Sequence, residues 1–173
     1  MRITAVLSAA ALSAGLALAV ASPAAASEEF CAEDAKYLVR AHRGNLAEVT
    51  SGQAALAESA NEGVRTIAGM LIRHHAWLDQ KITDLAERHG VAMPPKPNQR
   101  QRDDLAAVAA KNGVEFDAAW LALQEKAHVQ SLDFIDRELA GGCAPAVRDS
   151  ARVAAVPVRL HLQEVREALK PRE

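Results

Sequence analysis

Four long stretches of the chain repeat apolar residues at the three- and four-residue spacing of an amphipathic helix, and none alternates as a strand does. The stretches cover about residues 33–59, 62–89, 114–140 and 145–169. A shorter amphipathic segment, about residues 98–110, lies between the second and the third. The pattern therefore predicts an all-α protein.

Residues that favour or break helices separate these segments. Asn61 is a favourable N-cap for the second long helix, and Gly90 ends that helix. The stretch 91–97 contains three prolines and is predicted to be non-helical. Pro157 lies inside the fourth long helix, where it removes one backbone hydrogen bond and is expected to kink or split the helix.

The four long helices are predicted to form a bundle. A helix of about 26 residues is about 40 Å long, and each of the four has an apolar stripe to bury. Packing the stripes against one another gives a four-helix bundle.

The N-terminus has the layout of a secretory signal peptide. A basic start at Arg2 precedes an uncharged, Ala- and Leu-rich run, and small residues follow Pro23. We predict a signal peptide over residues 1–26, cleaved after Ala26, and a bundle domain over 27–173. A retained membrane anchor is the alternative, but the low share of bulky apolar residues favours cleavage. No segment of the mature chain is apolar for long enough to span a membrane, which predicts a secreted or periplasmic, cell-envelope protein.

The charge balance does not favour nucleic acid as a partner. The chain has 20 Lys and Arg against 22 Asp and Glu residues, a formal net charge of −2. No sustained basic stripe occurs along it.

Two cysteines, Cys31 and Cys143, predict one disulfide in an exported chain, with two free thiols as the alternative. In a simple up-down-up-down bundle they would lie about 40 Å apart, whereas a disulfide needs Cα atoms within about 7 Å. They meet if residues 91–113 cross the length of the bundle. One long crossover between the second and third long helices is the ferritin-like arrangement.

Each long helix contributes one histidine at a core-facing or core-flanking position. In the crossover arrangement His75, His128 and His161 lie near the middle of the bundle, within about one helical turn of one another. His42 falls one or two turns away, and Glu48 lies closer to their level.

Imidazoles that converge in the middle of a bundle predict a transition-metal site. His75, His128 and His161 would supply nitrogen ligands, and Glu48, or His42 if the register allows, would complete the shell. Zn²⁺, Cu²⁺ or Fe fits these ligands, and the sequence does not choose between them.

The alternative to a metal site is a set of structural histidines that are hydrogen-bonded by neighbours such as Asn45 and Gln124. His74 is expected at the edge of its helix, either solvated or supporting the site. The sequence therefore leaves two interpretations of the buried imidazoles.

A di-iron oxidoreductase would need a more complete set of carboxylates. The expected pattern is one Glu from each of two helices and Glu-x-x-His from each of the other two. Only Glu125 and His128 match, and the fourth long helix has the reverse order, His161 before Glu164. The residues therefore favour metal binding over catalysis.

Several motifs in this order resemble the DUF4142 family, a ferritin-like group of unknown function. The stretches that carry the resemblance are AHRGNLAEVTSGQAA, VRTIAGMLIRHHAWLDQKITDLAERHGVAMP, FDAAWLALQEKAH and VPVRLHL. The resemblance implies a ferritin-like fold and an envelope location, and its motifs fall on His75, His128, His161 and Glu48. The second motif of the family usually contains Asp-His, and His74 stands where that Asp is common.

Three functional hypotheses follow. The first is an envelope protein, non-enzymatic or weakly redox-active, that binds one transition-metal ion. The second is a metal-free structural or interaction module at the cell surface, with a protein partner that the sequence does not identify. The third is a di-iron-type oxidoreductase.

Overall fold

The computed structural model describes residues 29–171, and this part of the chain contains five helices and no strand. The helices are α1 (Ala32–Glu58), α2 (Glu62–Arg88), α3 (Gln99–Ala109), α4 (Gly113–Gly141) and α5 (Pro145–Leu169). The all-α prediction is confirmed, with every predicted helix end within one residue of the observed one. The predicted signal peptide lies outside the described residues. No helix between residues 29 and 171 has the length and apolarity needed to cross a bilayer.

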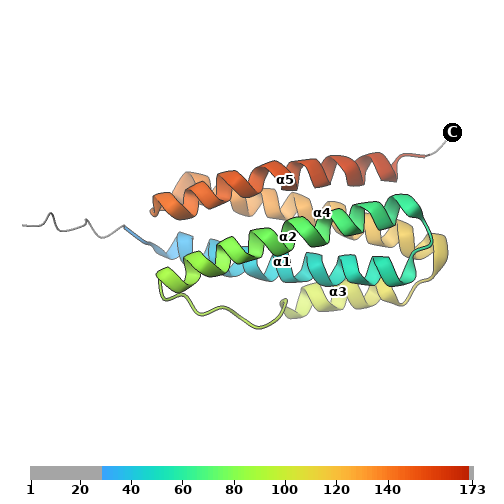
Figure 1. Cartoon of the computed structure of the whole chain (residues 1–173), viewed down its shortest axis with the longest axis horizontal. Coiled ribbons are helices and arrows are strands. Elements are labelled where there is room, and N and C mark those ends of the chain that lie inside the picture. The colour runs from blue at the N-terminus through green and yellow to red at the C-terminus, as the bar shows by residue number, and fades with distance from the viewer. Residues whose placement is uncertain (1–28, 172–173) are drawn as a thin grey trace, which may run out of the picture.

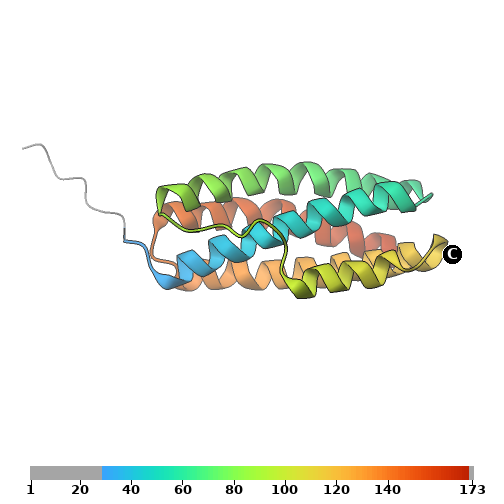
Figure 2. The same cartoon turned by 90° about the horizontal axis from the view of Figure 1, so that it is seen from below.

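The four long helices lie side by side along the long axis, and α3 lies against α1 and α4 on the outside (Figures 1 and 2). The chain between α2 and α3 turns back along the bundle, and α3 continues in that direction (Figure 2). As a result, α4 begins at the end of the bundle opposite to the end of α2. The end of α4 then comes to the start of α1.

A disulfide joins Cys31 to Cys143 at this end, with the two Cα atoms 5.7 Å apart. The pairing confirms the predicted disulfide. The buried carboxylate of Asp34 accepts hydrogen bonds from the backbone N–H groups of Cys31 (2.7 Å), Cys143 (3.0 Å) and Ala144 (3.1 Å). One side chain thus satisfies unpaired donors at the starts of both α1 and α5.

The helix ends of α2 follow the sequence signals. The Asn61 side chain accepts from the backbone N–H groups of Gly63 and Val64, and Gly90 adopts a φ of 65° after the last turn. Pro157 does not split α5, because the helix continues through it to Leu169.

The core consists of two apolar clusters with a polar layer between them. The cluster nearer the disulfide includes Leu38, Leu78, Ile82, Leu85, Ile135, Val147 and Val158. The other cluster includes Val64, Ile67, Leu71, Phe116, Trp120, Leu121 and Val165. The buried polar side chains between them are His42, Asn45, Glu48, Ser51, His75, Gln124, His128 and His161.

Helices α1 and α2 approach closely at Gly52. A Cβ atom at this position would lie 2.7 Å from Cγ1 of Ile72 and 3.1 Å from the backbone oxygen of Ala68. A methyl group here would have to displace the Ile72 side chain and would press on the backbone of α2, so position 52 favours glycine. The close approach fixes how α1 and α2 pack along their length.

Candidate metal centre

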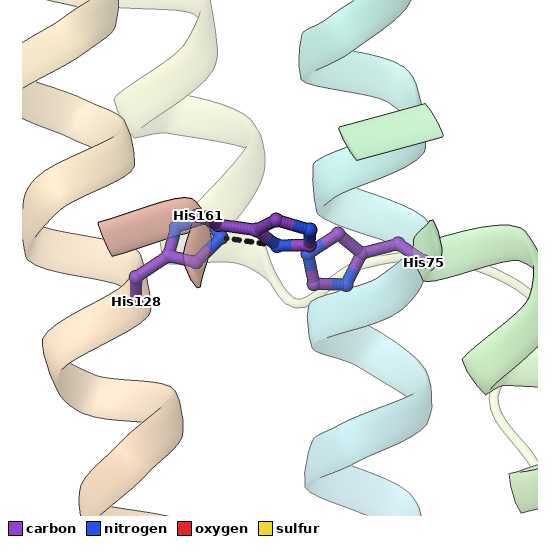
Figure 3. Close-up of side chains that lie close together, drawn as sticks. All are labelled: His75, His128 and His161. Carbon is purple, nitrogen blue, oxygen red and sulfur yellow. Dashed lines mark hydrogen bonds between the residues drawn. The ribbon is translucent and has the colours of Figure 1, made fainter. Parts of the chain in front are cut away.

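Three buried histidines from three helices meet in the polar layer. His75 comes from α2, His128 from α4 and His161 from α5, and each offers a nitrogen within 4.8 Å of the others. The ring centroids are 5.2–5.5 Å apart in all three pairs. Figure 3 shows the rings turned toward one another from separate helices. We call these three residues the histidine cluster.

Each member of the histidine cluster occupies a position in the buried stripe of its helix. The buried apolar residues on either side are Leu71 and Leu78, Leu121 and Ile135, and Val158 and Val165. The same spacing that directs these apolar side chains to the core directs the imidazoles there. Amphipathic helix formation therefore suffices to place the cluster.

Hydrogen bonds fix the tautomers of two members. Nδ1 of His75 donates to Oδ1 of Asn45 (2.9 Å), which leaves a lone pair on Nε2. That Nε2 atom has no hydrogen-bond partner in the protein. Nδ1 of His128 donates to the backbone oxygen of Gln124 (2.8 Å), so its Nε2 also presents a lone pair. Both inward nitrogens are therefore able to bind a cation.

His161 is held from both sides. Its Nδ1 atom lies 3.2 Å from Nε2 of His128, and its Nε2 atom lies 2.7 Å from Nδ1 of His74. Because His128 carries its proton on Nδ1, Nδ1–H of His161 donates to Nε2 of His128, and Nε2 of His161 accepts from Nδ1 of His74. To bind an ion, His161 would move its proton to Nε2, where it would donate to His74. Each ring of the cluster would then have its outward nitrogen hydrogen-bonded and its inward nitrogen free, as metal-binding histidines do.

Burial keeps all three imidazoles neutral at pH 7. Loss of solvent lowers the pKa of His128 to about 4. Loss of solvent and the neighbouring His128 and His74 lower the pKa of His161 to about 3. The pKa of His75 is also held well below 6.5, chiefly by burial and then by the other histidines. Because only neutral imidazole binds a metal, the cluster remains competent well below neutral pH.

The spacing fits a tetrahedral ion. Two nitrogens bound to Zn²⁺ at 2.0–2.1 Å are separated by about 3.3 Å. Nε2 of His128 and Nδ1 of His161 are already 3.2 Å apart. The third ring needs only a small shift, within the 4.8 Å that encloses the three nitrogens.

His42 lies outside the histidine cluster. Its Nδ1 atom is 2.8 Å from Oδ1 of Asp79, and its Nε2 atom donates to the backbone oxygen of Pro94 (2.9 Å). Both ring nitrogens are thus hydrogen-bonded, and the His42 side chain links α1 to the segment that follows α2. This engagement argues against His42 as the residue that completes the shell.

Glu48 is buried but is not one of the three clustered residues. Its Oε2 atom has no hydrogen-bond partner, and burial raises the pKa of its carboxyl to about 8. It lines a cavity together with His75. Its predicted place in the metal shell stays a prediction.

Two residues support the cluster through contacts that the sequence left open. His74 is half-buried and bonds to His161, so it supports the cluster and is not a freely solvated edge residue. Gln124 contacts His128 through its backbone oxygen, while its side-chain amide donates to Oγ of Ser51 (2.7 Å). The only feature of the sequence that could have predicted this role of His74 is its position next to His75.

The carboxylates of a di-iron centre lie elsewhere. Glu125 forms an ion pair with Arg166 (2.8 Å) near the surface, and Glu164 is exposed. Asp79 is bonded to His42. Among the described residues, no carboxylate belongs to the group that contains the three histidines.

The buried carboxyl of Glu48 gives a pH-dependent contribution to the stability of the metal-free protein. Because its folded-state pKa is raised from 4.5 to about 8, this contribution is full below pH 4.5 and is lost as the pH rises through 8. Relative to Glu48→Gln, the wild type should lose about 1.4 kcal/mol per pH unit inside this window. Urea unfolding of both proteins at pH 5, 6.5 and 8 in the presence of a chelator measures it. A pH-independent difference would contradict the assignment of a neutral Glu48.

A bundle of long helices that buries three histidines from three of its helices defines an all-α protein with a candidate metal centre. The chain belongs to the DUF4142 family, a domain of unknown function, which matches residues 19–168. No curated protein matches the chain.

A similar solved structure is the crystal structure of a DUF305 fragment from Deinococcus radiodurans. The match has a TM-score of 0.71 and 15% sequence identity, and covers 81% of this chain and 97% of that one. At this identity the likeness shows a shared fold alone.

Proposed function

We propose that this protein is an exported, ferritin-like bundle of the cell envelope that binds one transition-metal ion through His75, His128 and His161. The observation that supports metal binding most directly is that one nitrogen of each of the three rings points into a shared space, while the other nitrogen of each ring is hydrogen-bonded. The crossover before α4 supports the ferritin-like assignment. The disulfide supports an oxidising compartment outside the cytoplasm. The proposed role is metal binding, non-enzymatic or weakly redox-active.

The ligand set favours zinc or copper over iron. Neutral imidazoles suit Zn²⁺ and Cu²⁺, whereas non-haem iron in helical bundles is held largely by carboxylates. Three protein nitrogens also leave one coordination position open on a tetrahedral ion.

Metal content tests the proposal. Protein purified without a histidine tag, stripped with a chelator and titrated with Zn²⁺ or Cu²⁺ should bind one ion per chain. Its stability should rise by about 2.7 kcal/mol when the free metal is at 100 times the dissociation constant. Substoichiometric metal without a thermal shift would contradict the proposal, and two ions per chain would favour the di-iron hypothesis.

His74 should support metal affinity without binding the ion. Replacing it with Ala removes the hydrogen bond that holds the outward nitrogen of His161, and loss of such a partner typically lowers metal affinity 10–100-fold. Isothermal titration of His74→Ala measures the change. The matched control is Trp77→Ala, an exposed residue one turn further along α2, which should keep wild-type affinity. Equal affinity in both variants would show that the bond to His161 has no such role.

A second candidate function, a surface interaction module, rests on exposed apolar residues of α5. Val153, Val156 and Leu160 lie at the spacing of one helix face and are 43–68% exposed. The metal measurements above separate this role from metal binding, because a module of this kind needs no ion.

A further inference from the structure

A cavity of about 110 Å³ lies beside the histidine cluster. Its lining includes His75, Glu48 and Gln124 from the polar layer, and Lys126 and Gln130 from the exposed side of α4. It therefore connects the buried polar layer with the surface near α3. Its size accommodates a molecule of a few heavy atoms.

Three buried polar atoms without hydrogen-bond partners belong to the walls of this cavity. They are Nε2 of His75, Oε2 of Glu48 and Oε1 of Gln124. Nε2 of His75 would be taken by the metal ion, which leaves Oε2 of Glu48 and Oε1 of Gln124 as two unpartnered atoms for a polar species in the cavity. Oε1 of Gln124 is an acceptor, and the amide orientation is set by the hydrogen bond that its Nε2 donates to Oγ of Ser51.

The charge of the metal site indicates that the bound species is negatively charged. Three neutral imidazoles leave the charge of a divalent ion uncompensated in a buried position, and burying an unpaired charge is unfavourable. Among the described residues, no carboxylate belongs to the group that His75, His128 and His161 form. An anion from solution would supply the missing charge and the fourth ligand at once.

The mouth of the cavity is compatible with an anion. Arg40 lines the cavity with its guanidinium 4.9 Å from the ring centre of Phe134, and Lys126 lines it while paired with Asp104 (3.0 Å). Arg40 and Lys126 together carry two positive charges against the one negative charge of Asp104, and this net positive charge favours anion entry.

We propose that this cavity binds a small oxyanion that carries an O–H group, of the chemical class of hydrogencarbonate. The inference rests on the proposed metal function, because the anion would complete the coordination of an ion held by His75, His128 and His161. Oε2 of Glu48 would donate to the anion's other oxygen when the carboxyl is protonated, and the anion's O–H would donate to Oε1 of Gln124.

Copper-loaded protein provides the test, with azide as a spectroscopic reporter of the open coordination position. Azide should add a charge-transfer absorption band to the wild-type spectrum, and hydrogencarbonate should remove the band at lower concentration than formate, which lacks the O–H. Glu48→Leu, which has no donor at this position, should bind copper as tightly as the wild type but require about tenfold more hydrogencarbonate, whereas Glu48→Gln keeps an N–H donor and should behave as the wild type.

A second variant tests access through the cavity. Ala127 lines it, so Ala127→Leu should reduce binding of azide and hydrogencarbonate at least tenfold without loss of copper. The matched control is Ala122→Leu, at an exposed position on the same helix outside the cavity, which should behave as the wild type.

The outcomes distinguish the two proposals. Failure of the wild type to bind copper overturns both. Stoichiometric copper without an azide band, equal competition by formate and hydrogencarbonate, or unchanged anion binding in Ala127→Leu overturns the anion site alone. Loss of copper in Glu48→Leu would also overturn it, since Glu48 would then be a metal ligand.

Discussion

Replacing His128 with Ala should lower the affinity for Zn²⁺ or Cu²⁺ by more than about 100-fold. Changes in residues that only orient metal ligands cost 10–100-fold, and this substitution removes a ligand itself. It also removes the ring whose Nε2 lies 3.2 Å from Nδ1 of His161, so the inward nitrogen of His161 is no longer held in position. Titration against a chelator of known affinity measures the change, with circular dichroism to verify that the variant is folded.

The control is His89→Ala. His89 lies at the end of α2, where its ring stacks on Phe30 at 4.3 Å, far along the helix from His75. Its removal also takes one histidine from the chain, so unspecific binding to histidine would be lowered equally. A folded His128→Ala protein with wild-type affinity would exclude the histidine cluster as the metal site.

Removing the disulfide should lower the free energy of unfolding by about 4–5 kcal/mol. The bridge spans 112 positions of sequence, and in the chain-entropy model a closed loop of this size gives a stabilisation of that order. Native domains are stable by about 5–15 kcal/mol, so the double variant Cys31→Ser, Cys143→Ser should lose about a third or more of its stability. Urea unfolding of the metal-free protein measures the difference.

Two comparisons isolate the effect of the covalent link. Wild-type protein unfolded in the presence of a reductant should show the same loss as the double variant. Asp34→Asn tests the hydrogen bonds at the same end, since Asp34 accepts from the backbone at the starts of α1 and α5 while the disulfide remains. A double variant within 1 kcal/mol of the wild type would contradict the chain-entropy estimate.

Local patterns in the sequence predicted much of this fold. Helix ends depend on nearby residues such as Asn61 and Gly90, and the apolar stripes follow from helical periodicity. The two cysteines supplied the one long-range constraint, because their pairing is incompatible with a bundle of four consecutive antiparallel helices. The histidine cluster followed from the helix stripes and this topology together.

The surroundings of the cluster were harder to predict. Periodicity places His74 at a helix edge but does not show that its ring reaches His161 on α5. His42 faces the interior as expected, yet the backbone oxygen of Pro94, from the segment after α2, occupies its Nε2. Such contacts depend on where an irregular segment passes and on how side chains fill space, and neither follows a repeating pattern.

The close approach at Gly52 links helix spacing to the chemistry of the site. Asn45 lies two turns before Gly52 on the same helix, and its side chain orients His75 across the α1–α2 contact. A bulkier residue at position 52 would wedge the two helices apart and withdraw the amide from the imidazole. A residue far from the histidine cluster thus sets the alignment of one of its rings, and the glycine serves that alignment as much as the packing of the two helices.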